Sequence, residues 1–180
     1  MDPIHIFFEK ILPLPDNFWN DFNSGATEKN LPRKTMLVRQ GRINKNIFFI
    51  VTGLARAFYF KNDADITSRF LRENELIVPL NSENIELLEA SSMIIFSHDH
   101  LLNLQKKYPE FNFATRVITE RHYILSEERS YAMRMKSARE RYEEFLLHDP
   151  QIFQRVPLKH IASYLGMKPE TLSRIRARVR

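Results

Sequence analysis

The chain has 180 residues, of which 43% are apolar, carries a net charge of +5 and contains no cysteine. This length and composition fit one packed domain or two small ones, and the lack of thiols excludes disulfides, cysteine-ligated metal sites and thiol catalysis. No apolar run approaches the roughly 20 residues that cross a bilayer, and the opening MDPIHIFFEK lacks the pattern of a signal peptide. We therefore expect a cytoplasmic protein with no membrane partner.

Two short amphipathic helices are predicted in residues 3–22. Their apolar positions are spaced three and four apart and comprise Ile4, Phe7, Phe8 and Ile11, followed by Phe18, Trp19 and Phe22. Pro13 and Pro15 separate the two groups, because proline disrupts the interior of a helix. We expect these helices to cap the structure that follows.

Residues 31–96 show the pattern of a small antiparallel β structure. Five short runs rich in β-branched or aromatic residues predict strands: KTMLVRQG, NIFFIVTG, LARAFYF, DITSRFL and SSMIIF. Gly53 predicts a hairpin turn or bulge, and Asn62-Asp63 predicts another turn. Strands at this spacing favour a sandwich or a small barrel. The segment ENELIVPLNSENIELLEA does not alternate and contains a proline, so it fits either a loop or a helical turn.

A helix capped by Ser97 or Asp99 is predicted next, and a long helix follows it because residues 112–137 contain no proline or glycine. Seven positions of the long helix recur at alternating steps of three and four, namely Ala114, Val117, Arg121, Ile124, Glu128, Tyr131 and Met135. This seam predicts a homodimer, since a small barrel cannot cover an amphipathic helix of about 25 residues. The alternative is that the helix packs along its own barrel. A further helix is predicted from about Ser137 to His148.

Residues 156–180 predict two short helices that meet at Gly166. Gly166 stands where a left-handed residue ends a helix, and Pro169 stands where the first turn of a helix accepts proline. The side chains able to form a shared core are Ile161, Leu165, Leu172 and Ile175. These are the parts of a helix-turn-helix, whose second helix enters the major groove of DNA.

The basic charge of the chain is concentrated in this segment. Residues 151–180 hold seven Lys or Arg against one acidic residue, a net +6, so the first 150 residues must sum to −1. This favours a polyanion-binding end on a neutral body over a solvated basic tail or a structural helical hairpin. The side chains suited to base edges and phosphates are Lys168, Glu170, Thr171, Ser173, Arg174, Arg176 and Arg178.

At these residues the chain resembles the Crp/Fnr family of bacterial transcription regulators. VPLKHIASYLGMKPETLSRIR looks like the family's helix-turn-helix, and IFFIVTGLARAFYF looks like its cyclic-nucleotide-binding β-roll. The resemblance implies an α+β fold. It would contain an antiparallel β-roll of the jelly-roll or double-stranded β-helix type flanked by helices, a long dimerisation helix and a reduced C-terminal helix-turn-helix with little or no wing. The implied domains are a sensor at 1–110, the dimerisation helix at 111–137 and a DNA-binding domain at 138–180.

The resemblance also implies which residues read DNA. The family's base-reading positions fall on Pro169, Glu170 and Arg174 of this chain. Pro169 replaces an arginine of the best-known members, so one guanine contact is in doubt and the operator cannot be assumed. A dimer implies an inverted-repeat operator in double-stranded DNA. RNA polymerase would be a further partner of an activator, but the sequence identifies no surface for it.

The resemblance is weaker at the effector site. Cyclic-nucleotide binders of this fold carry Gly-Glu followed about ten residues later by an arginine that neutralises the cyclic phosphate. Here Asn74 stands at the glycine position, Glu75 follows it, and the arginine position falls near Ser82. We therefore predict that cyclic AMP does not bind in the family manner. The candidate pocket comprises Arg72, Glu75 and Ser82, and the effector remains unidentified.

Several alternatives stay open. The β-roll can bind another small molecule or an anion through Arg56, Arg69 or Arg72, or it can be an interaction module without an effector. His98 and His100 form an H-x-H pair that a cupin-like metal enzyme would use. Haem sensing would draw on the six histidines, His5, His98, His100, His122, His148 and His160. No catalytic constellation is visible, so neither enzymatic activity nor a metal or other cofactor is predicted.

Overall fold

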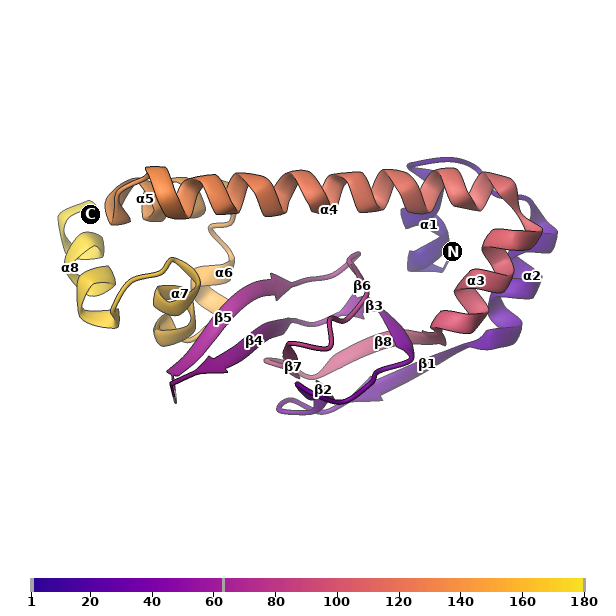
Figure 1. The fold of residues 1–180 in the computed structure, drawn as a ribbon, viewed down its shortest axis with the longest axis horizontal. Helices are drawn as coiled ribbons and strands as arrows, with labels where there is room; N and C mark the ends of the chain where they lie inside the picture. The colour runs from indigo at the N-terminus through magenta and orange to yellow at the C-terminus, as the bar shows by residue number, and fades with distance from the viewer. Residues whose placement is uncertain (1, 63, 180) are drawn as a thin grey trace. The chain divides into compact units, whose positions relative to one another are not determined.

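The computed structural model describes residues 2–62 and 64–179, with the elements shown in Figure 1. Its helices are α1 (Pro3–Glu9), α2 (Asp16–Gly25), α3 (His98–Lys107), α4 (Pro109–Met135), α5 (Ala138–His148), α6 (Ile152–Arg155), α7 (Leu158–Tyr164) and α8 (Pro169–Val179). Its strands are β1 (Ala26–Leu31), β2 (Met36–Val38), β3 (Asn46–Thr52), β4 (Ala55–Lys61), β5 (Ala64–Leu71), β6 (Leu76–Ile77), β7 (Asn84–Leu87) and β8 (Ser91–Ser97). None of the described helices is both long and apolar enough to cross a membrane.

The strands form the predicted antiparallel β-roll. One sheet has the order β1-β8-β3-β6 and the other has the order β2-β7-β4-β5. In the first sheet, β8 lies between β1 and β3 and pairs with both in antiparallel register. The α+β class and the β-roll inferred from the sequence are therefore confirmed.

The continuous apolar run of β3 reflects burial on both of its faces. Ile47 and Phe49 belong to a core shared with the helices, whereas Phe48 and Ile50 belong to the core inside the roll. Successive side chains of a strand point to opposite faces, so a strand between two cores needs apolar residues at every position. This explains why NIFFIVT does not alternate between apolar and polar residues.

The two predicted N-terminal helices are confirmed and pack through aromatic side chains. Phe8, Phe18 and Phe22 are almost completely buried, and Phe111 at the start of α4 contacts both Phe8 and Phe18. Aromatic rings that meet at tilted or edge-on angles bury a large area and fix the helix positions. The helices therefore close one side of the β-roll unit, as expected.

Two local expectations needed correction. In the segment expected to be a loop or a helical turn, the helical turn was wrong, and the loop expectation holds only outside the short strands β6 and β7. Gly53 adopts a φ of +109° between β3 and β4, which belong to different sheets, so it forms a corner rather than a hairpin turn. A side chain there would overlap Ser91, which explains the glycine. The turn expected at Asn62-Asp63 is present at Asn62, which has a φ of +49°, while Asp63 lies outside the described residues.

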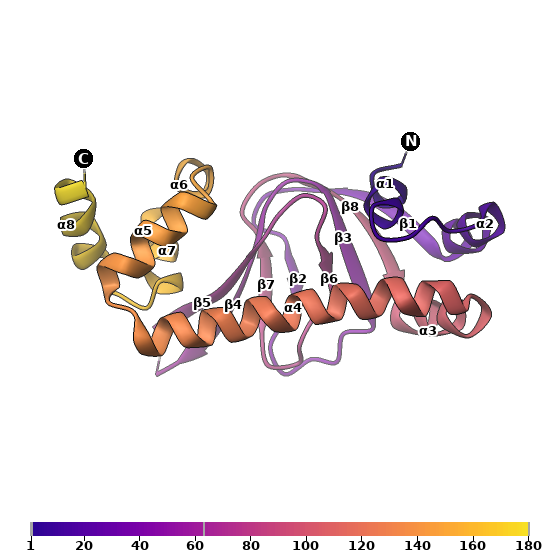
Figure 2. The same cartoon turned by 90° about the horizontal axis from the view of Figure 1, so that it is seen from above.

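The described residues form two compact units. The first contains residues up to Ala57 together with Phe70–Arg121, and the second contains Phe58–Arg69 together with residues from His122 onward. This division crosses α4, whereas the sequence suggested a separate helical segment at 111–137. Most of β4 and β5, within Phe58–Arg69, belongs to the same unit as the C-terminal helices. These helices are labelled α5 to α8 in Figure 2.

Candidate nucleic-acid interface

Helices α7 and α8 meet at a turn that Gly166 makes possible. Gly166 has a φ of +65°, its N–H donates to the Ser163 carbonyl at 3.1 Å, and the Met167 N–H donates to the Ala162 carbonyl at 3.0 Å. This pair of bonds is a Schellman motif, in which a left-handed residue ends the helix. The predicted end of the first helix is therefore confirmed, and the turn that follows it is closed by backbone bonds.

The two helices share the predicted apolar core. Ile161 and Leu172 are 1% and 0% exposed, and Leu165 is buried beside them. Ile175 is half-buried. Because both helices contribute to one core and one hydrogen-bonded turn, they form a single rigid element.

One face of α8 is left exposed, and it carries most of the side chains predicted to contact DNA. The exposed residues at the turn and along this face are Lys168, Pro169, Glu170, Ser173, Arg174, Ala177 and Arg178. Positions three and four apart lie on the same face of a helix, so these side chains form one stripe. Within the described part of the chain, no ion pair or side-chain hydrogen bond engages Glu170, Arg174 or Arg178. Their charges are available to an external partner.

Arg176 does not belong to this stripe. Its guanidinium lies 5.9 Å from the ring centre of Phe153 on α6, and the side chain is half-buried. Arg176 was predicted to contact DNA because of its charge. In the structure its side chain instead lies over Phe153. Thr171 is also half-buried. Ala177, which the sequence did not single out, lies within the exposed stripe, as its helical spacing from Ser173 would have indicated.

The predicted dimer seam on α4 is exposed over only part of its length. Ala114 is 0% exposed and belongs to the core of the first unit, so it is unavailable to a partner chain and its assignment to the seam was wrong. Val117 is half-buried. From residue 121 onward the seam positions are exposed, and the apolar ones are Ile124, Tyr131 and Met135, at 55%, 58% and 69% exposure. Tyr123 and Leu125, outside the seam, are also exposed apolar residues of this helix.

The residues of the candidate effector pocket do not converge on an open anion site. Arg72 pairs with Glu75 in the turn before β6, with Nε and Oε1 3.6 Å apart. Ser82 is exposed in the loop between β6 and β7. In that loop the Leu80 N–H donates to the carboxylate of Glu83 at 3.0 Å, and Glu83 is buried. The Leu80 N–H is therefore already bonded to a carboxylate of the chain itself and is not open to an anionic ligand.

Arg56, a second candidate for anion binding, is also engaged inside the protein. It is 4% exposed, and its Nε donates to Oε1 of Glu86 at 2.6 Å. The two residues lie on the neighbouring strands β4 and β7. A buried guanidinium requires such a partner, because an isolated buried charge is unstable.

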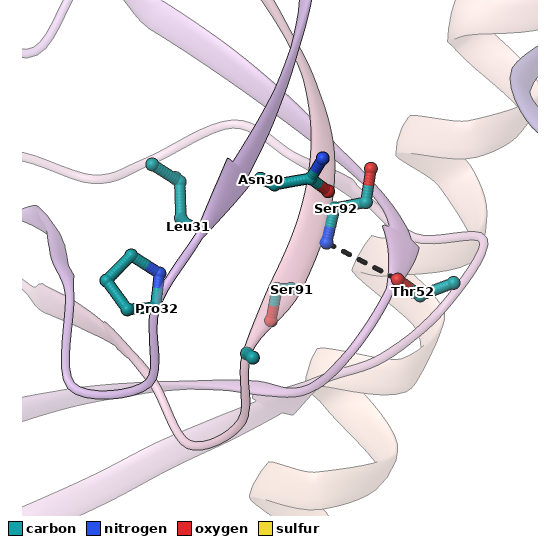
Figure 3. Close-up of a pocket in the computed structure, with 7 residues that line it drawn as sticks. Asn30, Leu31, Pro32, Thr52, Ser91 and Ser92 are labelled. Carbon is teal, nitrogen blue, oxygen red and sulfur yellow. Dashed lines mark hydrogen bonds between the residues drawn. The ribbon is translucent and has the colours of Figure 1, made fainter.

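A shallow pocket of about 350 Å³ lies at the ends of β1, β3 and β8 (Figure 3). Its polar side chains, all uncharged, are Asn30, Thr52, Ser91 and Ser92, and the hydroxyl of Thr52 accepts a bond from the Ser92 N–H at 3.3 Å. None of the candidate effector residues lines it. The pocket has no charged group that would select an anionic ligand.

The H-x-H pair occupies the first turn of α3 rather than neighbouring strands. Ser97 caps this helix by accepting from the His100 N–H at 3.0 Å, and Nε2 of His100 lies 3.1 Å from the Phe22 carbonyl oxygen. Among residues 2–62 and 64–179, no three His, Asp or Glu side chains are placed to hold a metal ion. The cupin-like alternative therefore gains no support from the arrangement.

Known structures share this fold. FixK2 from Bradyrhizobium japonicum matches with a TM-score of 0.77 at 18% identity, covering 86% of this chain and 84% of that one. The c-di-GMP-responsive global regulator CLP from Xanthomonas campestris matches with a TM-score of 0.74 at 12% identity, covering 92% and 91%. A protein assigned to the Crp/Fnr family of transcriptional regulators, from Eubacterium rectale, matches with a TM-score of 0.73 at 15% identity, covering 90% and 82%. Protein-family profiles and curated protein sequences gave no match. These similarities establish the Crp/Fnr-type fold.

Proposed function

We propose that this chain is a transcription regulator that binds double-stranded DNA sequence-specifically through the exposed face of α8. The observation that carries the proposal is the set of charged side chains on that face that have no partner within the described structure. They stand on the second helix of a helix-turn-helix, in a segment of net charge +6. The shared fold with regulators of the Crp/Fnr type supports this proposal. The protein acts by binding and not as an enzyme.

The chemistry of the face suits base recognition. Glu170 can accept a hydrogen bond from a cytosine amino group, and Arg174 can donate two to a guanine. Lys168 and Arg178 lie at the two ends of the stripe, where cations neutralise phosphates and give affinity that falls with salt. Pro169 has no side-chain donor, so we propose that this position makes no hydrogen bond to guanine of the kind that an arginine would make.

We extend the proposal to a homodimer formed through the exposed part of α4. Large apolar side chains on a solvent-facing helix mark an interaction surface, and the exposed run begins where α4 leaves its own core. A two-fold dimer would present two copies of α8 to half-sites about 34 to 36 Å apart, as an inverted repeat. The expected solution mass is twice that of the 21.4 kDa chain.

The same proposal excludes cyclic AMP as the effector. Arg56 is neutralised by Glu86, the β6–β7 loop carries the buried Glu83 carboxylate, and no arginine stands at Ser82. A cyclic phosphate would meet negative charge at the loop that should bind it. Micromolar binding of cyclic AMP in calorimetry, dependent on Glu75, would overturn this part of the proposal.

The β-roll then either binds a different small molecule or serves as a scaffold without an effector. The charges of the roll that are already paired or hydrogen-bonded within the protein favour the scaffold. A thermal-shift screen against a metabolite library separates the two roles, because a ligand that binds only the folded state raises the melting temperature by mass action.

The direct test of DNA binding is selection from random duplex DNA with the purified full chain at about 0.15 M salt, where phosphate contacts alone are weak. We expect enrichment of one inverted repeat. If the protein retains DNA without enriching any sequence, it binds as a general polycation, and the claim of specific regulation fails.

A further inference from the structure

Three consecutive residues at the end of α7 are each bonded to a different element of the second unit. Ser163 bonds to β5, Tyr164 to Arg129 of α4 and Leu165 to Arg141 of α5. We call Ser163, Tyr164 and Leu165 the junction. All of these contacts lie within the unit formed by Phe58–Arg69 and the residues from His122 onward.

Two arginines complete the cap of α7. The last four carbonyls of a helix have no partner within it. The Schellman turn engages the carbonyls of Ala162 and Ser163. The remaining two are engaged from outside: Nη2 of Arg129 donates to the Tyr164 carbonyl at 2.9 Å, and Nε of Arg141 donates to the Leu165 carbonyl at 2.9 Å. Cations at this position also face the negative end of the helix dipole.

The contact with Arg129 is made by both the backbone and the ring of Tyr164. The guanidinium carbon of Arg129 lies 3.9 Å from the centre of that ring, within the range of a cation–π interaction. A planar guanidinium can stack on the ring and donate to the carbonyl at the same time. This geometry ties the turn of the helix-turn-helix to one residue of α4.

The hydroxyl of Ser163 connects α7 to the edge of a sheet. β5 is the last strand of its sheet, so its outer N–H and C=O groups have no neighbouring strand. Ser163 Oγ accepts from the Thr67 N–H at 2.9 Å and donates to the Asp65 carbonyl at 3.0 Å. Thr67 is fully buried, where an unpaired N–H would be costly. One hydroxyl thus serves as the hydrogen-bonding partner of the strand edge.

We infer that the junction sets the angle of the recognition helix, and that Arg129, Arg141 and Ser163 are positioning residues for DNA binding. The inference rests on the proposed function and adds how the reading face is held. Helices α7 and α8 move together because they share a core and a closed turn. Fixing the end of α7 to α4, α5 and β5 therefore fixes α8 as well.

The inference separates half-site binding from binding of a complete operator. A half-site needs only the exposed face of α8, which the junction does not touch. A complete inverted repeat also needs two recognition helices held at the correct separation. If the junction is loosened, binding the second half-site must also order the recognition helix, which costs free energy. Affinity for the complete site therefore falls, while affinity for a single half-site is unchanged.

Arg129→Gln tests this separation, with Arg134→Gln as the matched control. Both variants remove one positive charge from the same helix, but Arg134 is exposed and makes no hydrogen bond, ion pair or ring contact among the described residues. We expect Arg129→Gln to lower affinity for the complete selected operator about tenfold or more, with half-site affinity within about twofold of wild type. Arg134→Gln should leave the ratio unchanged. Equal losses on both duplexes for Arg129→Gln would overturn the positioning role.

The rate of amide hydrogen exchange at Thr67 measures the hydrogen bond to Ser163 in the absence of DNA. Ser163→Ala should speed exchange of this amide about tenfold or more, and Ser163→Thr should restore its protection, because threonine keeps the hydroxyl. Amides of β3 and β8 serve as the internal reference for intact folding. Unchanged exchange at Thr67 in Ser163→Ala would overturn this part of the junction. If the wild type binds no duplex at all, the proposed function fails while the exchange result still tests the contact.

Discussion

The charged side chains on the exposed face of α8 differ from a group of charged side chains in the β-roll that are engaged by the protein itself. In the β-roll, Arg56 pairs with Glu86, Arg72 pairs with Glu75, and Glu73 accepts from the Gly53 N–H at 3.0 Å. On α8, charged residues along the exposed face have no such partner within the described chain. A charge that the protein neutralises serves the fold, and a charge left to solvent on an ordered face is available to a ligand. The comparison assigns recognition to the exposed face of α8 and a structural role to these engaged charges of the roll.

The largest expected effect comes from removing the core beneath α8. Leu172 is 0% exposed, so Leu172→Ala should cost about 2 to 5 kcal/mol in unfolding free energy and abolish binding to every duplex as the helix-turn-helix loosens. Leu71→Ala makes a similar cavity inside the roll and should leave DNA affinity unchanged in the fraction that stays folded. Denaturant titration followed by DNA binding below the transition gives both quantities. Normal affinity in Leu172→Ala would break the assignment of recognition to α8.

Arg56→Ala tests the structural role of the charges in the roll. The variant leaves Glu86 without the guanidinium bond and should lower the free energy of unfolding by about 1.5 to 3 kcal/mol. Arg174→Ala is the matched control on α8, and it should change stability by less than about 0.5 kcal/mol because Arg174 is exposed. Urea denaturation gives the free energy of unfolding of both variants, so that the two losses can be compared. Equal stability losses would remove the distinction between the two regions.

Arg178→Ala should weaken binding to specific and random duplexes alike, because a phosphate contact carries no sequence information. The slope of log affinity against log salt should decrease in magnitude by about one. Arg176→Ala provides a comparison, since Arg176 lies over Phe153 and should change this slope less. Fluorescence anisotropy across a salt series gives both slopes. A larger slope change in Arg176→Ala would place that side chain on the DNA.

The smallest effect concerns pH and the contact between α2 and α3. Hydrogen bonds from Lys107 and Tyr108 lower the pKa of Asp21 below the ordinary aspartate value of 3.8. A carboxyl group with a lowered folded-state pKa stabilises the protein above its unfolded pKa, and this contribution is lost as pH falls through the folded pKa. Asp21→Asn should therefore lower the melting temperature slightly at neutral pH and leave it near wild type once the pH has fallen below the folded-state pKa of Asp21. A constant difference at all pH values would refute the electrostatic origin.

The elements predicted correctly from the sequence have local signals. Gly166 and Pro169 mark the turn and the start of α8, and Ser97 and Ser137 cap the helices that follow them. Glu140 completes a capping box at Ser137, and hydrogen bonds from Ser137 lower the pKa of this glutamate. Such signals act within a few residues, so the sequence contains all that is needed to find them.

The elements that were missed depend on distant partners. β6 has only two residues and pairs with β3, while β7 pairs with β2, with Met36 opposite Glu86. Short strands of this kind are defined by their pairing rather than by their own pattern. Ala114 fits the same spacing as Ile124, and periodicity cannot state whether the partner is the chain's own core or a second copy. Arg174 lies on the exposed face of α8, whereas Arg176 lies on the face toward Phe153. A count of charges along the sequence cannot distinguish these two faces.

The most direct test of the account is a competition between the selected inverted repeat and a scrambled duplex of equal length. Wild type, Glu170→Ala and Arg174→Ala are each measured at about 0.15 M salt, where general phosphate binding is weak. We predict that wild type discriminates strongly and that each substitution costs about 1 to 3 kcal/mol of discrimination, with the lost preference at one position per half-site. Discrimination that is unchanged in both variants would contradict the claim that the exposed face of α8 reads DNA.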